Sequence, residues 1–147
     1  MIAMEMQVWR KRSKRGIFSR WSIVYGGDTL KCRSLDVWKK SATLSSEIYL
    51  ELAQLKDYGF KDQLTRSGLS IPSNIAEGLE RVSDKEKIRF LDIARGSVAE
   101  AQTQIYIGMK IEYIDLKIGN HWIEELESIG KMITSLIYSI SKESSHG

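Results

Sequence analysis

The sequence contains few of the residues from which metal sites and disulfides are built. Its single cysteine, Cys32, excludes an internal disulfide and a zinc site made of cysteines. It has only two histidines, His121 and His146, whereas a di-iron bundle needs Glu-x-x-His on each of two helices. We therefore predict that the protein holds no metal and needs no cofactor.

Catalytic motifs and membrane-spanning stretches are also missing. The sequence has neither the phosphate loop that ends in Gly-Lys-Ser/Thr nor the Gly-x-Ser-x-Gly turn of serine hydrolases. No apolar run approaches the roughly 18–20 residues that a membrane helix requires. The opening stretch, MIAMEMQVWRKRSKR, has no apolar core followed by a small-residue cleavage site. The sequence thus predicts a cytoplasmic protein that is not an enzyme and contacts no membrane.

Positive charge is concentrated near one end of the chain. The 147 residues carry 22 Lys and Arg against 19 Asp and Glu, a net charge of +3. Residues 1–33 hold eight basic and two acidic residues, so residues 34–147 hold 14 against 17 and carry a net charge of −3. A chain of this length suggests one domain. We divide it into a basic N-terminal extension (1–33), a helical body (34–142) and a polar tail (143–147).

Apolar residues recur every three or four positions from residue 35 onward, which is the pattern of helices with one buried face. The first helix is predicted from about residue 35 to 55. Ser34 or Asp36 is expected to cap its start, and Gly59 is suited to a left-handed turn after its end.

The second helix is predicted from about residue 61 to 79 and contains Pro72, the only proline in the chain. Proline lacks a backbone N–H, so it either kinks a helix or begins a new one. We favour one continuous, kinked helix, because the apolar stripe passes through Pro72 without changing phase. Gly78 is expected to help this helix end.

The third helix is predicted to begin after Ser83 and to run to about Tyr113. Ser83 and Glu86 have the spacing of a capping box, in which each side chain bonds the other's backbone N–H. Two apolar rows run along this helix, which predicts burial on two sides. Small residues such as Gly96 and Ser97 indicate close contacts with other helices.

The last helix is predicted from about residue 121 to 141, after a link at residues 114–120 in which Asn120 acts as its cap. Four helices joined by short links are typical of an all-α, antiparallel up-down-up-down four-helix bundle.

Four polar residues fall on or near the predicted buried faces: Asn74 and Glu77 on the second helix, Ser97 and Glu100 on the third. The two carboxylates would suit acid–base chemistry. Polar groups inside a bundle more often bond across helices and fix the register, because an unmet partner costs about 1–3 kcal/mol. We therefore expect structural or interface roles for them.

The basic extension is the main candidate for ligand binding. Its run RKRSKR lies next to Trp9, with Phe18 and Trp21 further on. Basic side chains neutralise phosphates and aromatic rings stack on unpaired bases, so the composition suits RNA. The alternative is a solvated extension without a function. The basic residues of the run are Arg10, Lys11, Arg12, Lys14 and Arg15.

Several stretches resemble the four-helix bundle proteins encoded in 23S rRNA intervening sequences. They are SIPSNIAEG at 70–78, RFLDIARGSVAEAQTQ at 89–104, LDVWKKS at 35–41 and LESIGKMITSLI at 126–137. The resemblance covers about Leu35 to Lys142 and not the basic extension. It implies a four-helix bundle, a ring-shaped homopentamer, and kinship with the retroelement accessory protein that binds nucleic acid and a reverse transcriptase.

The resemblance also implies a set of signature positions with architectural rather than catalytic roles. They are Ile71, Pro72, Ser73, Asn74, Ala76, Glu77, Gly78, Arg81, Phe90, Ala94, Gly96, Ser97 and Glu100. That accessory protein is notably basic, whereas the helical body here has a net charge of −3.

Two hypotheses follow for function. The first is a non-enzymatic homo-oligomer that binds RNA, such as ribosomal RNA, through the basic extension and through the cations Arg81, Lys85, Lys87 and Arg89. The second is an adaptor that binds a protein partner, for example a polymerase or reverse transcriptase, without touching nucleic acid.

Overall fold

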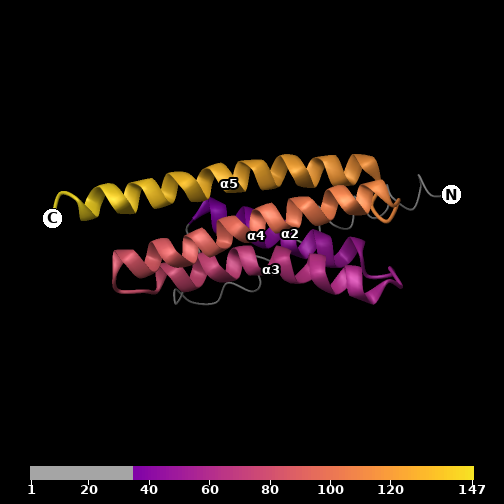
Figure 1. Ribbon diagram of the computed structural model, residues 1–147, viewed down its shortest axis with the longest axis horizontal. Coiled ribbons are helices and arrows are strands. Elements are labelled where there is room, and N and C mark those ends of the chain that lie inside the picture. The colour runs from indigo at the N-terminus through magenta and orange to yellow at the C-terminus, as the bar shows by residue number, and fades with distance from the viewer. Residues whose placement is uncertain (1–34) are drawn as a thin grey trace.

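The structure is a computed structural model that describes residues 35–147, and this part of the chain forms four helices and no strand (Figure 1). This confirms the all-α prediction. The helices are α2 (Asp36–Glu51), α3 (Tyr58–Leu79), α4 (Asp84–Lys110) and α5 (Leu116–Ser144). The predicted extension, with Arg10, Lys11, Arg12, Lys14 and Arg15, lies outside the described residues.

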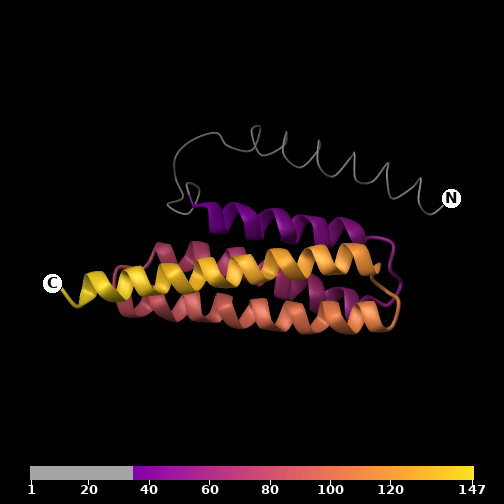
Figure 2. The same ribbon diagram turned by 90° about the horizontal axis from the view of Figure 1, so that it is seen from above.

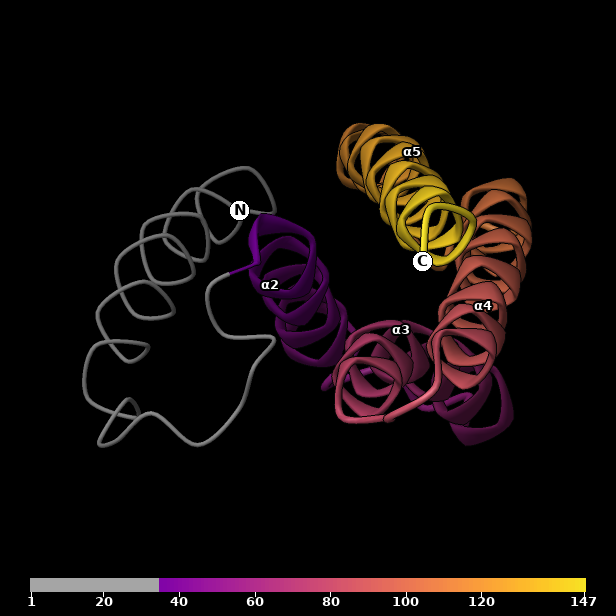
Figure 3. The same ribbon diagram turned by 90° about the vertical axis from the view of Figure 1, so that its left-hand side faces the viewer.

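Each helix packs against the next one along the chain, and α5 also contacts α2. The view along the bundle shows this order around the core (Figure 3). The α3–α4 connection lies at the opposite end of the bundle from the α4–α5 connection (Figure 1). Seen from above, α2 and α4 lie on opposite sides, with α5 between them (Figure 2). The outer face of α4 is therefore far from α2.

The core consists of the apolar stripes that the three- and four-residue spacing predicts. Its largest fully buried side chains are Trp122, Ile48, Leu52, Leu64, Ile71, Ile75, Leu91, Ile105, Leu126, Ile129 and Ile133. Trp122 lies in the second turn of α5, because this helix begins at Leu116 and not at residue 121.

The predicted junction between α2 and α3 is wrong. Gly59 lies in the first turn of α3 and does not end α2, which stops at Glu51. Asp57 caps α3, since its carboxylate accepts a hydrogen bond from the backbone N–H of Phe60 at 3.0 Å. Of the two predicted caps of α2, Asp36 lies in the first turn of the helix, and Leu35 occupies the cap position without a side-chain cap bond. The other, Ser34, lies outside the described residues.

The predicted start of the last helix is also wrong. Asp115 caps α5 by accepting hydrogen bonds from the N–H groups of Lys117 and Ile118, so Asn120 lies within the helix. α4 ends at Lys110, earlier than predicted, but α5 begins at Leu116, so the connection at residues 111–115 is shorter than the predicted link. A tight turn follows, in which Glu112 has a φ of 63°.

At the α3–α4 junction the cap prediction is half correct. Ser83 accepts a hydrogen bond from the N–H of Glu86 at 3.2 Å. The carboxylate of Glu86 bonds Arg89, at 3.0–3.2 Å, in place of the backbone of Ser83. The capping box is therefore incomplete.

Candidate interaction surface

The signature stretch at residues 70–78 forms the last turns of α3, where it packs against α4. The helix is continuous through the buried Pro72, so the alternative that Pro72 begins a new helix is wrong. Gly78 lies in the last turn of α3, one residue before the helix ends at Leu79. A Cβ atom on Gly78 would lie 3.0 Å from the Cβ of Phe90 and 3.2 Å from the carbonyl oxygen of Lys87. Its small size lets α4 approach α3 closely.

Polar side chains join α3 to α4 farther from the α3–α4 connection than this contact. The hydroxyls of Ser70 and Ser97 lie 2.9 Å apart, and the amide of Asn74 donates to the Ser70 hydroxyl at 2.9 Å. One helical turn or so away, Ser67 donates to Gln104 at 2.6 Å. The hydroxyls of Ser67 and Ser97 and the amide of Asn74 also donate to backbone carbonyls of their own helices, so the polar groups at this contact have several partners.

The two predicted carboxylates do not meet. Glu77 pairs with Arg81 on its own helix, and Glu100 accepts a long hydrogen bond of 3.4 Å from Gln104. Both side chains are exposed. Because the general acid and base of a catalytic pair must reach the same reacting group, this arrangement gives no support to acid–base chemistry.

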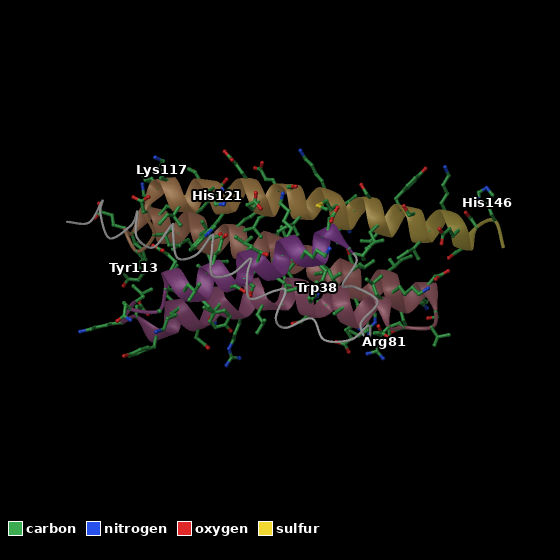
Figure 4. All side chains as sticks on the ribbon, turned by 180° about the vertical axis from the view of Figure 1, so that it is seen from behind. Trp38, Arg81, Tyr113, Lys117, His121 and His146 are labelled. Atoms are coloured by element: carbon green, nitrogen blue, oxygen red, sulfur yellow. The ribbon has the colours of Figure 1, made fainter. Side chains whose placement is uncertain are left out.

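Four of the predicted phosphate-binding cations belong to the described residues, and they lie at the α3–α4 end of the bundle: Arg81, Lys85, Lys87 and Arg89. Figure 4 shows Arg81 at this end and Tyr113 at the other. Arg81 pairs with Glu77, Lys87 with Asp84 at 2.8 Å, and Arg89 with Glu86.

Only Lys85 of this set has no ion-pair partner among the described residues. Residues 77–89 hold four basic and four acidic side chains. The cluster is close to neutral, which weakens its attraction for phosphate.

The ring of Phe90 organises two of these cations. The guanidinium carbon of Arg81 lies 4.6 Å from the ring centroid, and that of Arg89 lies 4.5 Å from it. Stacking of this kind holds an arginine in place along the protein surface. The hydrogen bond from Arg89 lowers the pKa of Glu86 below its ordinary value. These features point to a local structural network at the α3–α4 end.

The outer face of α4 carries an apolar row that no other described element covers. Ile93 and Ile107 in α4, and Ile111 at the cap position directly after it, are 42%, 49% and 46% exposed. Gly96 and Glu100 lie on the same face between them, and we call these five residues the ridge. Nothing among residues 35–147 lies within 4 Å of a Cβ atom built on Gly96, so packing between these residues does not explain a glycine there. The predicted close helix contact at Gly96 is therefore not made within the described part of the chain.

Sequence reasoning missed the contact that joins the α2–α3 and α4–α5 connections. The hydroxyl of Tyr113 donates to Asp57 at 3.0 Å, and the Tyr113 ring meets Phe60 edge-on at 5.4 Å. The hydrogen bond from the Phe60 N–H and then that from Tyr113 lower the pKa of Asp57. Since these residues are far apart along the chain, no local spacing could have revealed the contact.

Residues 35–147 contain no group of three His, Cys, Asp or Glu side chains placed to hold a metal ion. His121 lies near Lys117 at the start of α5, and His146 lies at the opposite end of the bundle (Figure 4). Within the same residues, no helix is both long and apolar enough to span a bilayer.

Comparison with known proteins agrees with the fold. A solved structure from Bacteroides thetaiotaomicron, a protein of unknown function from the S23 ribosomal protein family, has a TM-score of 0.65 and 28% sequence identity to this chain. The match covers 69% of this chain and 97% of that one. None of the curated proteins compared matches the chain. The family model of the 23S rRNA-intervening sequence protein matches residues 33–135, and the chain belongs to this family.

Proposed function

We propose that the protein is a non-enzymatic homo-oligomer of antiparallel four-helix bundles, pentameric as the resemblance implies, that binds RNA in the cytoplasm. Each bundle has an up-down-up-down order and a kink at Pro72. It also carries the basic N-terminal extension (residues 1–33), which we call the arm. The uncovered ridge on α4 is the observation that supports assembly, because an apolar row of this kind on a helix is stabilised by burial against a partner.

The arm, rather than the α3–α4 end, is the proposed site of most phosphate contacts. The cations at the α3–α4 end are matched by an equal number of carboxylates, whereas the run RKRSKR contains no acidic residue. Unmatched cations release more counterions when they bind phosphate. The arm therefore contributes the salt-dependent part of the affinity.

A titration of a labelled, short structured rRNA at several salt concentrations tests this proposal. Neutralising Arg10, Lys11, Arg12, Lys14 and Arg15 together is expected to abolish most binding at about 0.15 M salt and to flatten its salt dependence. Neutralising Lys85 and Lys87 serves as the comparison and is expected to have a smaller effect. Binding that ignores salt, or that survives neutralisation of the arm, would contradict the proposal.

The adaptor function is the second candidate, and one observation favours it. Val82, in the connection between α3 and α4, is 98% exposed, and a protein partner that covered this end of the bundle would bury its apolar side chain. An adaptor would form a stable oligomer with negligible RNA affinity near physiological salt and would copurify with a protein. A monomer without partners would exclude it.

A further inference from the structure

Two glycines in the middle of long helices have no explanation within the described chain. A Cβ atom built on Gly96 in α4 meets nothing within 4 Å, and one built on Gly130 in α5 makes an ordinary contact of 3.7 Å with Val98. By contrast, Gly108 and Gly119 are crowded by neighbouring side chains at less than 3 Å. A glycine costs about 1 kcal/mol relative to alanine inside a helix. Both open glycines thus weaken their own helices without improving the packing of the protomer.

The two glycines lie on different surfaces. Gly96 belongs to the ridge, whereas Gly130 lines an open groove of about 760 Å³ between α4 and α5. Val98, Ala99 and Gly130 line the groove, and Arg95, Lys131 and Glu127 add charged groups to it. At about 100° per residue, the ridge and the groove side of α4 lie roughly 145° apart around the helix.

We propose that the ridge of one copy of this chain packs into the α4–α5 groove of a second copy. Gly96 and Gly130 would then allow the backbones of two helices from different copies to approach closely. The contact joins two different surfaces, so every copy has a free ridge or groove with which to bind the next. This inference rests on the proposed homo-oligomer and specifies how its copies meet.

Charge supports the pairing of these two surfaces. Glu100 on the ridge has no ion-pair partner among the described residues, and neither has Lys131 in the groove. Both side chains are exposed. Arg95 adds a second cation to the groove, although it already pairs with Asp92. Among the described residues, Glu127 is the one acidic side chain in the lining of the groove. Packing the ridge into the groove brings Glu100 toward Lys131, where the two opposite charges stabilise each other.

The two surfaces also lie at the same level along α4. Ridge residues 93–111 overlap groove residues 95–102 of the same helix. A contact between different surfaces builds a ring when the rotation between successive copies closes, and an open helical filament when it does not. The overlap lets two copies lie side by side without a shift along α4, which is the arrangement that a closed ring requires.

Reversing each charge and then both tests the pairing. The mass of the full-length protein is measured by light scattering on a sizing column for wild type, Glu100→Lys, Lys131→Glu and the double variant. Each single variant is expected to raise the protomer dissociation constant at least tenfold, because like charges then meet at every contact. The double variant is expected to regain most of the wild-type mass. Lys117→Glu and Glu124→Lys are the matched controls on α5 outside the groove, and neither should change the mass.

Two results would overturn the inference in different ways. A wild-type chain that runs as a single protomer would remove the proposed homo-oligomer together with this contact. An oligomeric wild type whose mass is unchanged by Lys131→Glu would overturn this contact alone. Gly130→Ala gives a second measurement, because its new methyl group fits within the protomer. We expect it to weaken assembly while the helical circular dichroism stays the same.

Discussion

The hydroxyl of Tyr113 donates a hydrogen bond of 3.0 Å to the carboxylate of Asp57, across the end of the bundle. Asp57 also caps α3 through the N–H of Phe60. One side chain therefore ties the start of α3 to the turn between α4 and α5. Because both bonds favour the ionised carboxylate, this end of the bundle depends on pH.

The sign of this dependence follows from the pKa of Asp57, which is lowered in the folded state. Its stabilisation is fully present above the ordinary pKa of 3.8 and is lost as the pH falls through the lower folded value. In Tyr113→Phe one of the bonds that lower the pKa is gone, so stability should fall less steeply below about pH 4. Urea unfolding between pH 7 and pH 3 measures this. Tyr138→Phe is the control, and an equal change in both variants would contradict the prediction.

Glu51 is expected to act in the opposite direction. Its partial burial, and then the negative charge of Asp115, raise its pKa above the ordinary value of 4.5. The charged form is therefore disfavoured in the folded protein, and the penalty is present above the raised pKa and relieved as the pH falls through it. Glu51→Gln should raise the thermal midpoint at pH 7 and leave it nearly unchanged near pH 3. A lower midpoint at pH 7 would show that the carboxylate stabilises this site.

Gly96→Ala should separate folding from assembly. In the protomer the new methyl group meets no atom within 4 Å, so the variant should gain about 0.5–1 kcal/mol in the free energy of unfolding. In the proposed oligomer the same methyl group should weaken the contact between copies. Unfolding measured at several protein concentrations separates the two effects. The gain in the free energy of unfolding is expected at the lowest concentrations, where the copies are dissociated.

Gly78→Ala is the comparison for this experiment. Its methyl group would press against Phe90 and the Lys87 carbonyl at 3.0–3.2 Å, so it should cost about 1–3 kcal/mol at every concentration. If both glycine variants behave alike, the distinction between open and crowded glycines is wrong.

The hydrogen bonds between α3 and α4 are expected to contribute to stability rather than to activity. Ser97→Ala removes the bond between the buried Ser97 and Ser70 and should cost about 1 kcal/mol in the free energy of unfolding. Ser139→Ala removes only an exposed bond to Ser135 within α5, so it should change stability by less than about 0.5 kcal/mol. Denaturant titration of both variants tests this, and equal costs would contradict the assigned role.

The start of α5 gives a direct test of the structure against the sequence pattern. Asp115→Ala removes two cap bonds and should cost about 0.5–2 kcal/mol. Asn120→Ala should be neutral or slightly stabilising, because Asn120 is an exposed residue inside the helix and alanine is the better helix former. Thermal unfolding of the two variants decides between the caps, and a larger loss for Asn120→Ala would favour the sequence-based start.

The four helices and most of their buried stripes could be predicted from the sequence alone. Burial of one helix face imposes a spacing of three and four residues, and this spacing is a local property of the chain. The Ser83 cap was predicted for the same reason, since its partner is three residues away. The unusual motif around Pro72 similarly indicated the family that the comparison shows.

The tertiary structure decided what depends on distances between helices. The positions of Gly78 and Gly96 in the sequence do not reveal that Gly78 is pressed against α4 whereas a Cβ atom on Gly96 would meet no neighbour. Nor does composition tell that Arg81, Lys87 and Arg89 each meet a carboxylate. Sequence determines which face of a helix is buried, because that face repeats locally. Packing alone determines which atoms meet across helices, because these contacts join residues far apart in the chain.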